Sequence, residues 1–165
     1  MEIVKQLCKT YEGKFYQNGI EKSKDYLELN QVNDYKGIFK FKGEVIIIKQ
    51  VVHYNPICIF ILIKSTLSFG YQIRMRSFFN SMKNFIGKGN LGFGKYEFIG
   101  NPAHFTKLTK NQRIIEILES YNVFVELLNY KIPCIVLKPF HAIGSQKKCE
   151  EYFELLVLLK RELET

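Results

Sequence analysis

The spacing of hydrophobic and polar residues divides the chain into regions that predict different elements. Near the start, apolar residues recur three and four positions apart, which predicts a short amphipathic helix over Glu2 to Tyr11. Gly13 is placed to end this helix, and Phe15 to Gly19 favours a short strand. Residues 20–31 mix polar and apolar positions and favour neither period.

β-branched and aromatic residues dominate the next region, which predicts strands. Ile38 to Phe41 and Val45 to Val52 are joined by Lys42-Gly43, a pair typical of a tight hairpin turn. Asn55-Pro56 then marks a turn before Ile57 to Ile63, which is apolar at every position. Such a run is typical of a strand covered on both faces, so we expect it at the centre of the sheet.

Strict alternation returns at Tyr71 to Phe79, which predicts a strand with one polar face. That polar face comprises Gln72, Arg74 and Arg76. Phe78 to Ile86 favours a short helix, and a glycine-rich segment follows it. Because its glycines make regular structure costly, we expect an exposed loop there. The glycines are Gly87, Gly89, Gly92 and Gly94.

The last third has the most regular pattern. Lys95 to Ile99 predicts a strand, which Gly100-Asn101-Pro102 ends with residues that favour a helix start. Thr109 is a candidate cap for a helix to about Tyr121. Two strands, 123–128 and 132–137, then form a hairpin, and Ser145 is a candidate cap for a final helix to about Leu159.

Together these elements predict an α+β protein. We expect one domain over residues 1–165, because no linker or repeat divides the chain. Its core would be a single antiparallel, meander-like sheet of about six strands between Tyr35 and Leu137, with the N- and C-terminal helices packed against it. The apolar surface of the final helix, at 152–159, is wider than a helix on a sheet usually needs. This width predicts that the helix contacts a protein partner or a second copy of the chain.

The C-terminal part resembles a group of uncharacterised bacterial and archaeal proteins. The resemblance covers about residues 94–165 and lies in Gly94-Lys95-Tyr96-Glu97-Phe98, the helix around Ile114 to Leu118, the strand Ile132 to Val136 and the leucine-rich last helix. It implies a domain that runs strand, helix, hairpin, helix. Members of that group often carry membrane-spanning segments. In this chain the most lipid-like stretch, Val45 to Ile63, is interrupted by polar residues and predicts strands instead.

Positive charge is concentrated in the middle of the chain. The net charge is +8, yet Val45 to Tyr96 contains seven lysines and arginines and no acid. A general lysine-rich composition would scatter lysines, but it does not explain an acid-free stretch of this length. A basic surface attracts nucleic acid, an acidic protein or an anionic membrane. We expect nucleic acid or another polyanion to bind through the basic segment 49–113, in which the candidate anion-binding residues are Arg74, Arg76, Lys83, Lys88 and Lys95.

Phenylalanines interleave with these cations. Phe78, Phe79, Phe85 and Phe93 would stack on bases if exposed, or belong to the core if buried. The sequence contains only four arginines, at 74, 76, 113 and 161, so few side chains are available for bidentate base reading. The pattern therefore indicates non-specific phosphate contact as the second candidate function, beside a binding or assembly module.

The glycine segment also contains the literal pattern G-x-G-x-x-G, at Gly87, Gly89 and Gly92. A dinucleotide site needs this pattern between a strand and a helix, with an acid about 20 residues later. Here a strand is predicted after it. We therefore expect no nucleotide cofactor, and interpret the segment as a basic loop whose backbone N–H groups can approach an anion.

Catalytic and metal-binding patterns are weak. Cys134, His141 and Cys149 match no common zinc spacing, and the only aspartates are Asp25 and Asp34. A pair between Cys58 and His53 or His104 is possible only if the fold brings them together, so we favour a protein without catalytic activity, cofactor or metal. The widely spaced cysteines follow no secretory signal, which predicts reduced thiols and a cytoplasmic location.

Overall fold

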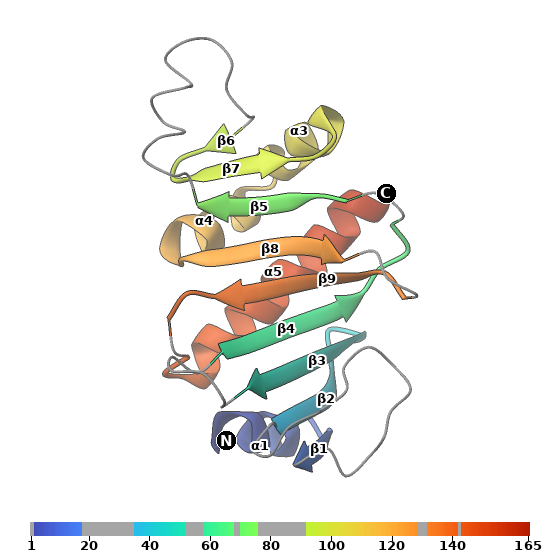
Figure 1. Ribbon diagram of the computed structural model, residues 1–165, viewed down its shortest axis with the longest axis vertical. Helices are drawn as coiled ribbons and strands as arrows, with labels where there is room; N and C mark the ends of the chain where they lie inside the picture. Colours follow the sequence, from blue (N-terminus) through green and yellow to red (C-terminus); the bar gives the residue numbers. More distant parts are fainter. Residues whose placement is uncertain are drawn as a thin grey trace.

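One nine-stranded antiparallel sheet, with helices on one of its faces, forms the framework of the protein (Figure 1). The structure is a computed structural model that describes residues 2–17, 35–51, 58–67, 70–75, 92–128, 132–141 and 143–165. The described strands are β1 (Lys14–Gln17), β2 (Tyr35–Phe41), β3 (Glu44–Val51), β4 (Cys58–Lys64), β5 (Gln72–Met75), β6 (Gly92–Phe93), β7 (Tyr96–Ile99), β8 (Val123–Leu128) and β9 (Cys134–Pro139). The described helices are α1 (Glu2–Thr10), α3 (Pro102–Lys110), α4 (Gln112–Ser120) and α5 (Gln146–Glu164).

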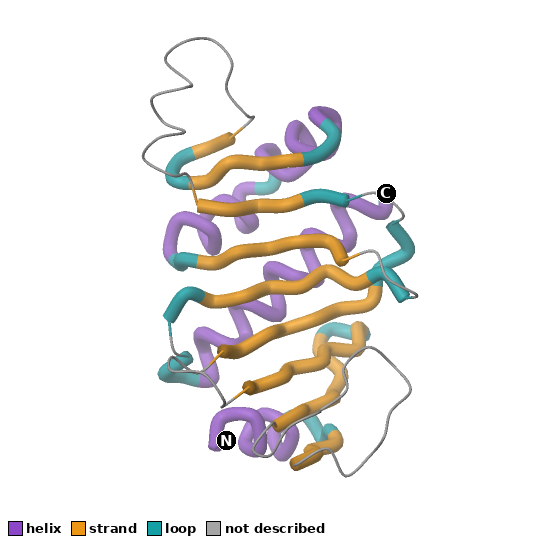
Figure 2. Tube along the Cα trace, viewed as in Figure 1, coloured by secondary structure: helices purple, strands orange, loops and turns teal. Residues whose placement is uncertain are grey.

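The strand order corrects two predictions, about six strands and a meander. The order is β1-β2-β3-β4-β9-β8-β5-β7-β6, so the hairpin β8/β9 lies between β4 and β5 (Figure 2). Ile135 and Leu137 of β9 are completely buried, and β9 packs against α5, so this strand needs a place beneath that helix. Burial in the middle of the sheet therefore explains why the C-terminal hairpin is inserted there.

Local residue chemistry accounts for the turns and helix starts. Lys42 and Gly43 both have positive φ, 49° and 85°, the conformation that joins two twisted strands in a two-residue hairpin loop. Asn101 and Ser145 cap α3 and α5, as expected. The prediction that Thr109 caps the helix before β8 is wrong. It lies inside α3, and Asn111 caps α4 through its side chain, which accepts from the Ile114 backbone N–H.

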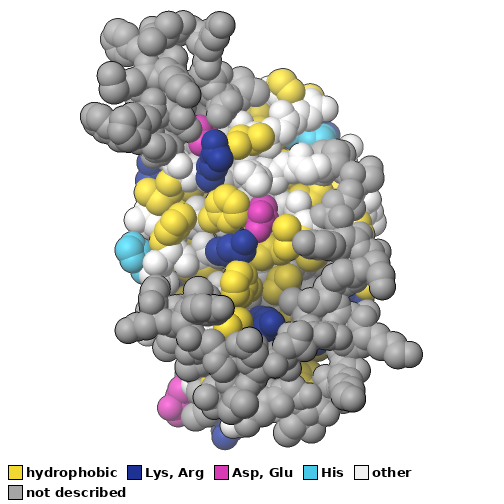
Figure 3. All heavy atoms as spheres, viewed as in Figure 1, with side chains coloured by type: hydrophobic (Ala, Val, Ile, Leu, Met, Phe, Trp, Pro, Cys, Tyr) yellow, Lys and Arg dark blue, Asp and Glu magenta, His cyan; other side chains and the backbone are white. Residues whose placement is uncertain are grey.

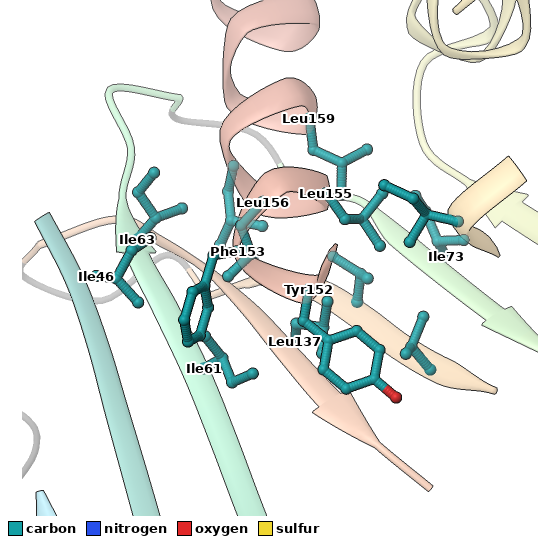
Figure 4. Packing of buried hydrophobic residues seen from close by; sticks show 14 of the residues in the cluster. Ile46, Ile61, Ile63, Ile73, Leu137, Tyr152, Phe153, Leu155, Leu156 and Leu159 are labelled. Atoms are coloured by element: carbon teal, nitrogen blue, oxygen red, sulfur yellow. The ribbon is translucent and has the colours of Figure 1, made fainter. Parts of the chain in front are cut away.

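Helix α5 crosses the sheet diagonally and carries the centre of the core (Figure 1). It contacts β4 and β9 beneath it, and α3 and α4 beside it. Its aromatic and leucine side chains point toward the isoleucines and leucines of the sheet (Figure 4). Those buried completely or almost so are Tyr152, Phe153, Leu155, Leu156, Leu159 and Leu163. The wide apolar surface of the final helix is thus used largely within the chain itself.

Ion pairs and a carboxylate contact hold the same helix to neighbouring elements. Glu154 accepts hydrogen bonds from Lys42 Nζ at 2.7 Å and from Arg113 Nη2 at 2.7 Å. At its end, Glu164 accepts from Ser65 Oγ at 2.8 Å. This contact, together with burial of Leu163, explains why α5 continues five residues past the predicted end at Leu159.

The packing of Phe153 predicts a large loss of stability on truncation. Phe153 is completely buried and contacts the rings of Phe39, Phe41 and Tyr11. We expect Phe153→Ala to lower the free energy of unfolding by about 3–5 kcal/mol, measured by urea denaturation. Phe140→Ala is the matched control, because Phe140 is 56% exposed and its loss should change stability by about 0.5 kcal/mol or less. Equal losses for the two variants would contradict this packing.

The contacts of Glu154 predict a pH-dependent stability. Hydrogen bonds from Lys42 lower the pKa of the Glu154 carboxyl, and those from Arg113 lower it further. Because the folded pKa is depressed, this contribution is present above the unfolded pKa of about 4.3 and is lost as the pH falls through the folded value. We expect Glu154→Gln to cost about 0.5–1 kcal/mol at pH 7 and almost nothing near pH 2.5, measured by denaturation at both pH values. A loss of stability that is equal at both pH values would contradict a stabilising role of the ionised Glu154 carboxylate.

Candidate functional site: the open face of the sheet

Pairing between strands defines which residues share each face of the sheet. Directly paired residues of antiparallel strands point to the same side, and successive residues point to opposite sides. One continuous row faces the helices, because a side chain added at Gly37 would meet Cys8 and Val4 of α1. This row consists of Phe15, Gly37, Ile48, Ile61, Leu137, Val125, Ile73 and Phe98.

The opposite side, which we call the open face, carries no described helix (Figure 1). Figure 3 looks onto it: between the grey atoms, Lys and Arg side chains lie among hydrophobic ones. Its charged residues in the described strands are Lys14, Lys36, Lys40, Lys49, Lys64, Arg74, Lys138, Glu97 and Glu126. Seven cations against two carboxylates leave a surplus of +5 among the described strand residues of this face.

Cations and aromatic rings alternate along one row of the open face. This basic–aromatic row lies beside the helix-facing row and consists of Tyr16, Lys36, Lys49, Phe60, Lys138, Phe124, Arg74 and Glu97. Lys138 Nζ lies 5.6 Å from the ring centre of Phe60 and 5.3 Å from that of Phe124. Lys36 Nζ lies 5.8 Å from the ring centre of Tyr16. These distances are within the range of cation–π attraction.

Two ion pairs fix cations within the row. Arg74 is paired with Glu97, directly opposite it on β7, and Lys138 with Glu126 on the neighbouring strand. The side chains of Arg74 and Lys138 are 40% and 37% exposed, whereas those of Glu97 and Glu126 are 3% and 14% exposed. The carboxylates therefore lie deeper than their partners. An approaching anion meets the cations first.

Of the predicted anion-binding residues, the structure brings Arg74 to the open face and gives Lys95 other partners. Lys95 lies in the turn between β6 and β7, where its Nζ donates to the Glu119 carbonyl at 2.9 Å and to Asn122 Oδ1 at 2.8 Å. Lys95 thus provides a hydrogen-bond donor for a backbone carbonyl in the last turn of α4. Arg76, Lys83 and Lys88 lie outside the described residues.

The glycine segment is only partly described. Gly87 and Gly89 lie outside the described residues. The exposed-loop prediction is wrong at its C-terminal end, where Gly92 begins β6 and pairs with Glu97. Gly94 then forms the turn to β7 with φ of 51°, a conformation that glycine adopts without strain.

Sequence reasoning did not identify the three central members of the basic–aromatic row. Phe60 falls in the apolar run that we expected to be covered on both faces, and Phe124 and Lys138 lie outside the acid-free segment. Alternation within β8 and β9 places Phe124 and Lys138 on one face, but only the pairing of β9 with β4 brings Phe60 beside them. Phe93, by contrast, packs against Tyr96 and Phe105, so the core interpretation holds for this ring.

The described thiols and imidazoles do not form an activated group. Burial raises the pKa of Cys149 to about 12 and also raises the pKa of Cys8 and Cys134. Burial and the charge of Lys107 lower the pKa of His104, on α3. His141 is exposed, and His53 lies outside the described part of the chain. Within the described part, no three His, Cys, Asp or Glu side chains gather where they could hold a metal ion.

Comparison with known proteins adds no relative. No family model matches the chain, and neither the curated proteins nor the solved structures contain a significant match to it. The resemblance of residues 94–165 to the bacterial and archaeal group therefore stays a prediction. None of the helices in the described ranges combines the length and the apolar character needed to cross a membrane.

Burial of two cysteines predicts that they resist modification. Cys8 is 3% exposed and Cys149 is 0% exposed, so an alkylating reagent should reach them only after unfolding. We expect iodoacetamide at pH 8 to leave both unmodified in the native protein and to modify both in 6 M guanidinium, measured by peptide mass spectrometry. Modification of Cys149 in the native protein as fast as in guanidinium would contradict this burial.

Proposed function

We propose that the protein is a non-catalytic binding module that holds a polyanion on its open face. The observation that supports this most is the surplus of +5 among the described residues of that face, set against a single net positive charge on the remaining described residues. Those remaining residues contain 11 Lys and Arg and 10 Glu. A polyanion would therefore approach the open face rather than the helical side.

The arrangement of the cations favours an extended ligand over a single small anion. Between Lys49 on β3 and Arg74 on β5 the row crosses four strand spacings of about 4.8 Å, or about 19 Å in all. Cations spread over such a length contact several phosphates or sulfates of one chain, and each contact releases counterions. A compact ligand would need its partners gathered at one point.

The interaction of the final helix with a protein partner or a second copy has less support. Val157 and Leu158 of α5 are only partly buried, but the large side chains of this helix lie in the core. The exposed large hydrophobic residues in the described ranges, Val45, Ile99 and Phe140, all lie outside α5. A polyanion on the open face is therefore the better proposal, and we expect it to be met in the cytoplasm.

Neutralising open-face lysines should weaken polyanion binding and its salt dependence. We expect Lys40→Gln, Lys64→Gln and Lys138→Gln combined to lower the affinity for the 15-mer dT15 and for a heparin oligosaccharide. The slope of log K against log salt for dT15 should fall by about 2, since each lost phosphate contact contributes about 0.7. Fluorescence anisotropy at 50–300 mM NaCl measures the affinities and the salt slope. Over these salt concentrations the affinity of a phosphate-binding protein changes strongly.

The control variant loses the same number of positive charges but leaves the open face unchanged. Lys5, Lys9 and Lys147 are exposed on α1 and in the first turn of α5, and their combined change to Gln should lower the affinity much less. Equal effects of the two triple variants would mean that only net charge matters. Failure of the unaltered protein to bind either polyanion at 50 mM NaCl would end the proposal.

A further inference from the structure

We propose, building on the function above, that the polyanion is single-stranded nucleic acid, whose bases stack on Phe60 and Phe124 while Lys138 contacts its phosphates. Charge alone does not explain the two rings. Both belong to the side of the sheet away from the helices, and both are only partly buried. A strand position outside the core usually carries a polar side chain, because an exposed ring lowers solubility.

The spacing of rings and cations matches what a nucleotide presents. Phe124 and Lys138 are directly opposite each other on β8 and β9, and Phe60 follows on β4. Ring and cation therefore alternate at strand spacing, about 4.8 Å apart. Each nucleotide carries one flat base and one phosphate, so bases on the two rings, which lie two strand spacings or about 9.6 Å apart, would place a phosphate near Lys138 between them. Cation and ring together are the usual elements of single-strand binding.

Single strands fit this surface better than a duplex. The two rings are partly buried among neighbouring strand residues, so only a base free to leave its own stack can lie on them. A membrane fits less well. Insertion needs protruding apolar side chains, and in the described strands only Val45 and Ile99 are exposed large hydrophobics, away from the basic–aromatic row.

Glu126 sets the strength of the interaction at the centre of the row. Its carboxylate pairs with Lys138 and therefore competes with any phosphate for the same ammonium group. Arg74, the arginine of the row, is already paired with Glu97. Binding should therefore tolerate many base sequences, because stacking does not distinguish bases through hydrogen bonds. Removing the charge of Glu126 should tighten binding of the nucleic acid, because Lys138 then has no competing carboxylate.

The first test compares a single strand with a strand that lacks bases and with a duplex, whose bases are paired. Fluorescein-labelled dT15, an abasic 15-mer with the same phosphates and a 15-base-pair duplex are titrated by anisotropy at one salt concentration. We expect dT15 to bind at least about fivefold more tightly than the abasic strand, the smallest effect expected from one stacked base. Tighter binding of U15 than of dT15 would assign the ligand to RNA, and the reverse to DNA; either supports the proposal.

The second test removes single rings while keeping apolar volume. Phe60→Leu and Phe124→Leu should each weaken dT15 binding about fivefold or more and leave the affinity for the abasic strand and for heparin unchanged. Phe105→Leu is the matched control, because Phe105 is partly buried on the helical side, against Phe93 and Phe98. Glu126→Gln should tighten binding of dT15 and of the abasic strand alike. Thermal melting verifies that each variant is folded.

The outcomes separate this proposal from the one it rests on. If the abasic strand binds as tightly as dT15 and both Leu variants bind normally, the stacking proposal is wrong and polyanion binding stands. If neither dT15, the abasic strand nor heparin binds, both proposals are wrong. Tighter binding of phosphatidylserine vesicles than of dT15, unaffected by the ring variants, would replace nucleic acid with a membrane surface.

Discussion

The packing of α5 across β4 and β9 is the interaction on which the two faces of this sheet depend. Phe153, Leu155 and Leu156 are completely buried against the isoleucines and leucines of these central strands (Figure 4). Removing this much apolar surface from water is the main favourable term in folding. Because α1, α3 and α4 lie on the same side, one face is committed to the core, and the other carries none of the described helices.

Acidic and basic side chains are also distributed unequally between the two sides of the sheet. The carboxylates of α5 are used close to the helix, where Glu154 pairs with Lys42 and Arg113 and Glu164 caps the turn after β4. Among the described strand residues, the acids on the other side of the sheet are Glu97 and Glu126, and each is the less exposed member of its ion pair. The cations in the described part of the open face include Lys14, Lys36, Lys40 and Lys138, which lie outside the acid-free segment.

Local features of the fold could be predicted from sequence, and the candidate surface could not. The turn at Lys42-Gly43 and the cap at Ser145 depend on a few adjacent residues, so the pattern identifies them. The place of β9 beside β4 depends on packing between strands that 69 residues of chain separate, which no local pattern records. Arg74 was found because its strand alternates. Phe60 was not, because a wholly apolar run hides which face each residue takes.

Amide chemical-shift mapping tests most directly whether the open face is the binding surface. At 19.4 kDa the ¹⁵N-labelled protein suits such a titration with dT15. The account predicts that the largest shifts fall on β4, β8 and β9, at and beside Phe60, Phe124 and Lys138, with α1 and α5 nearly unchanged. Shifts concentrated on α1 or α5, with these three strands unaffected, would contradict it.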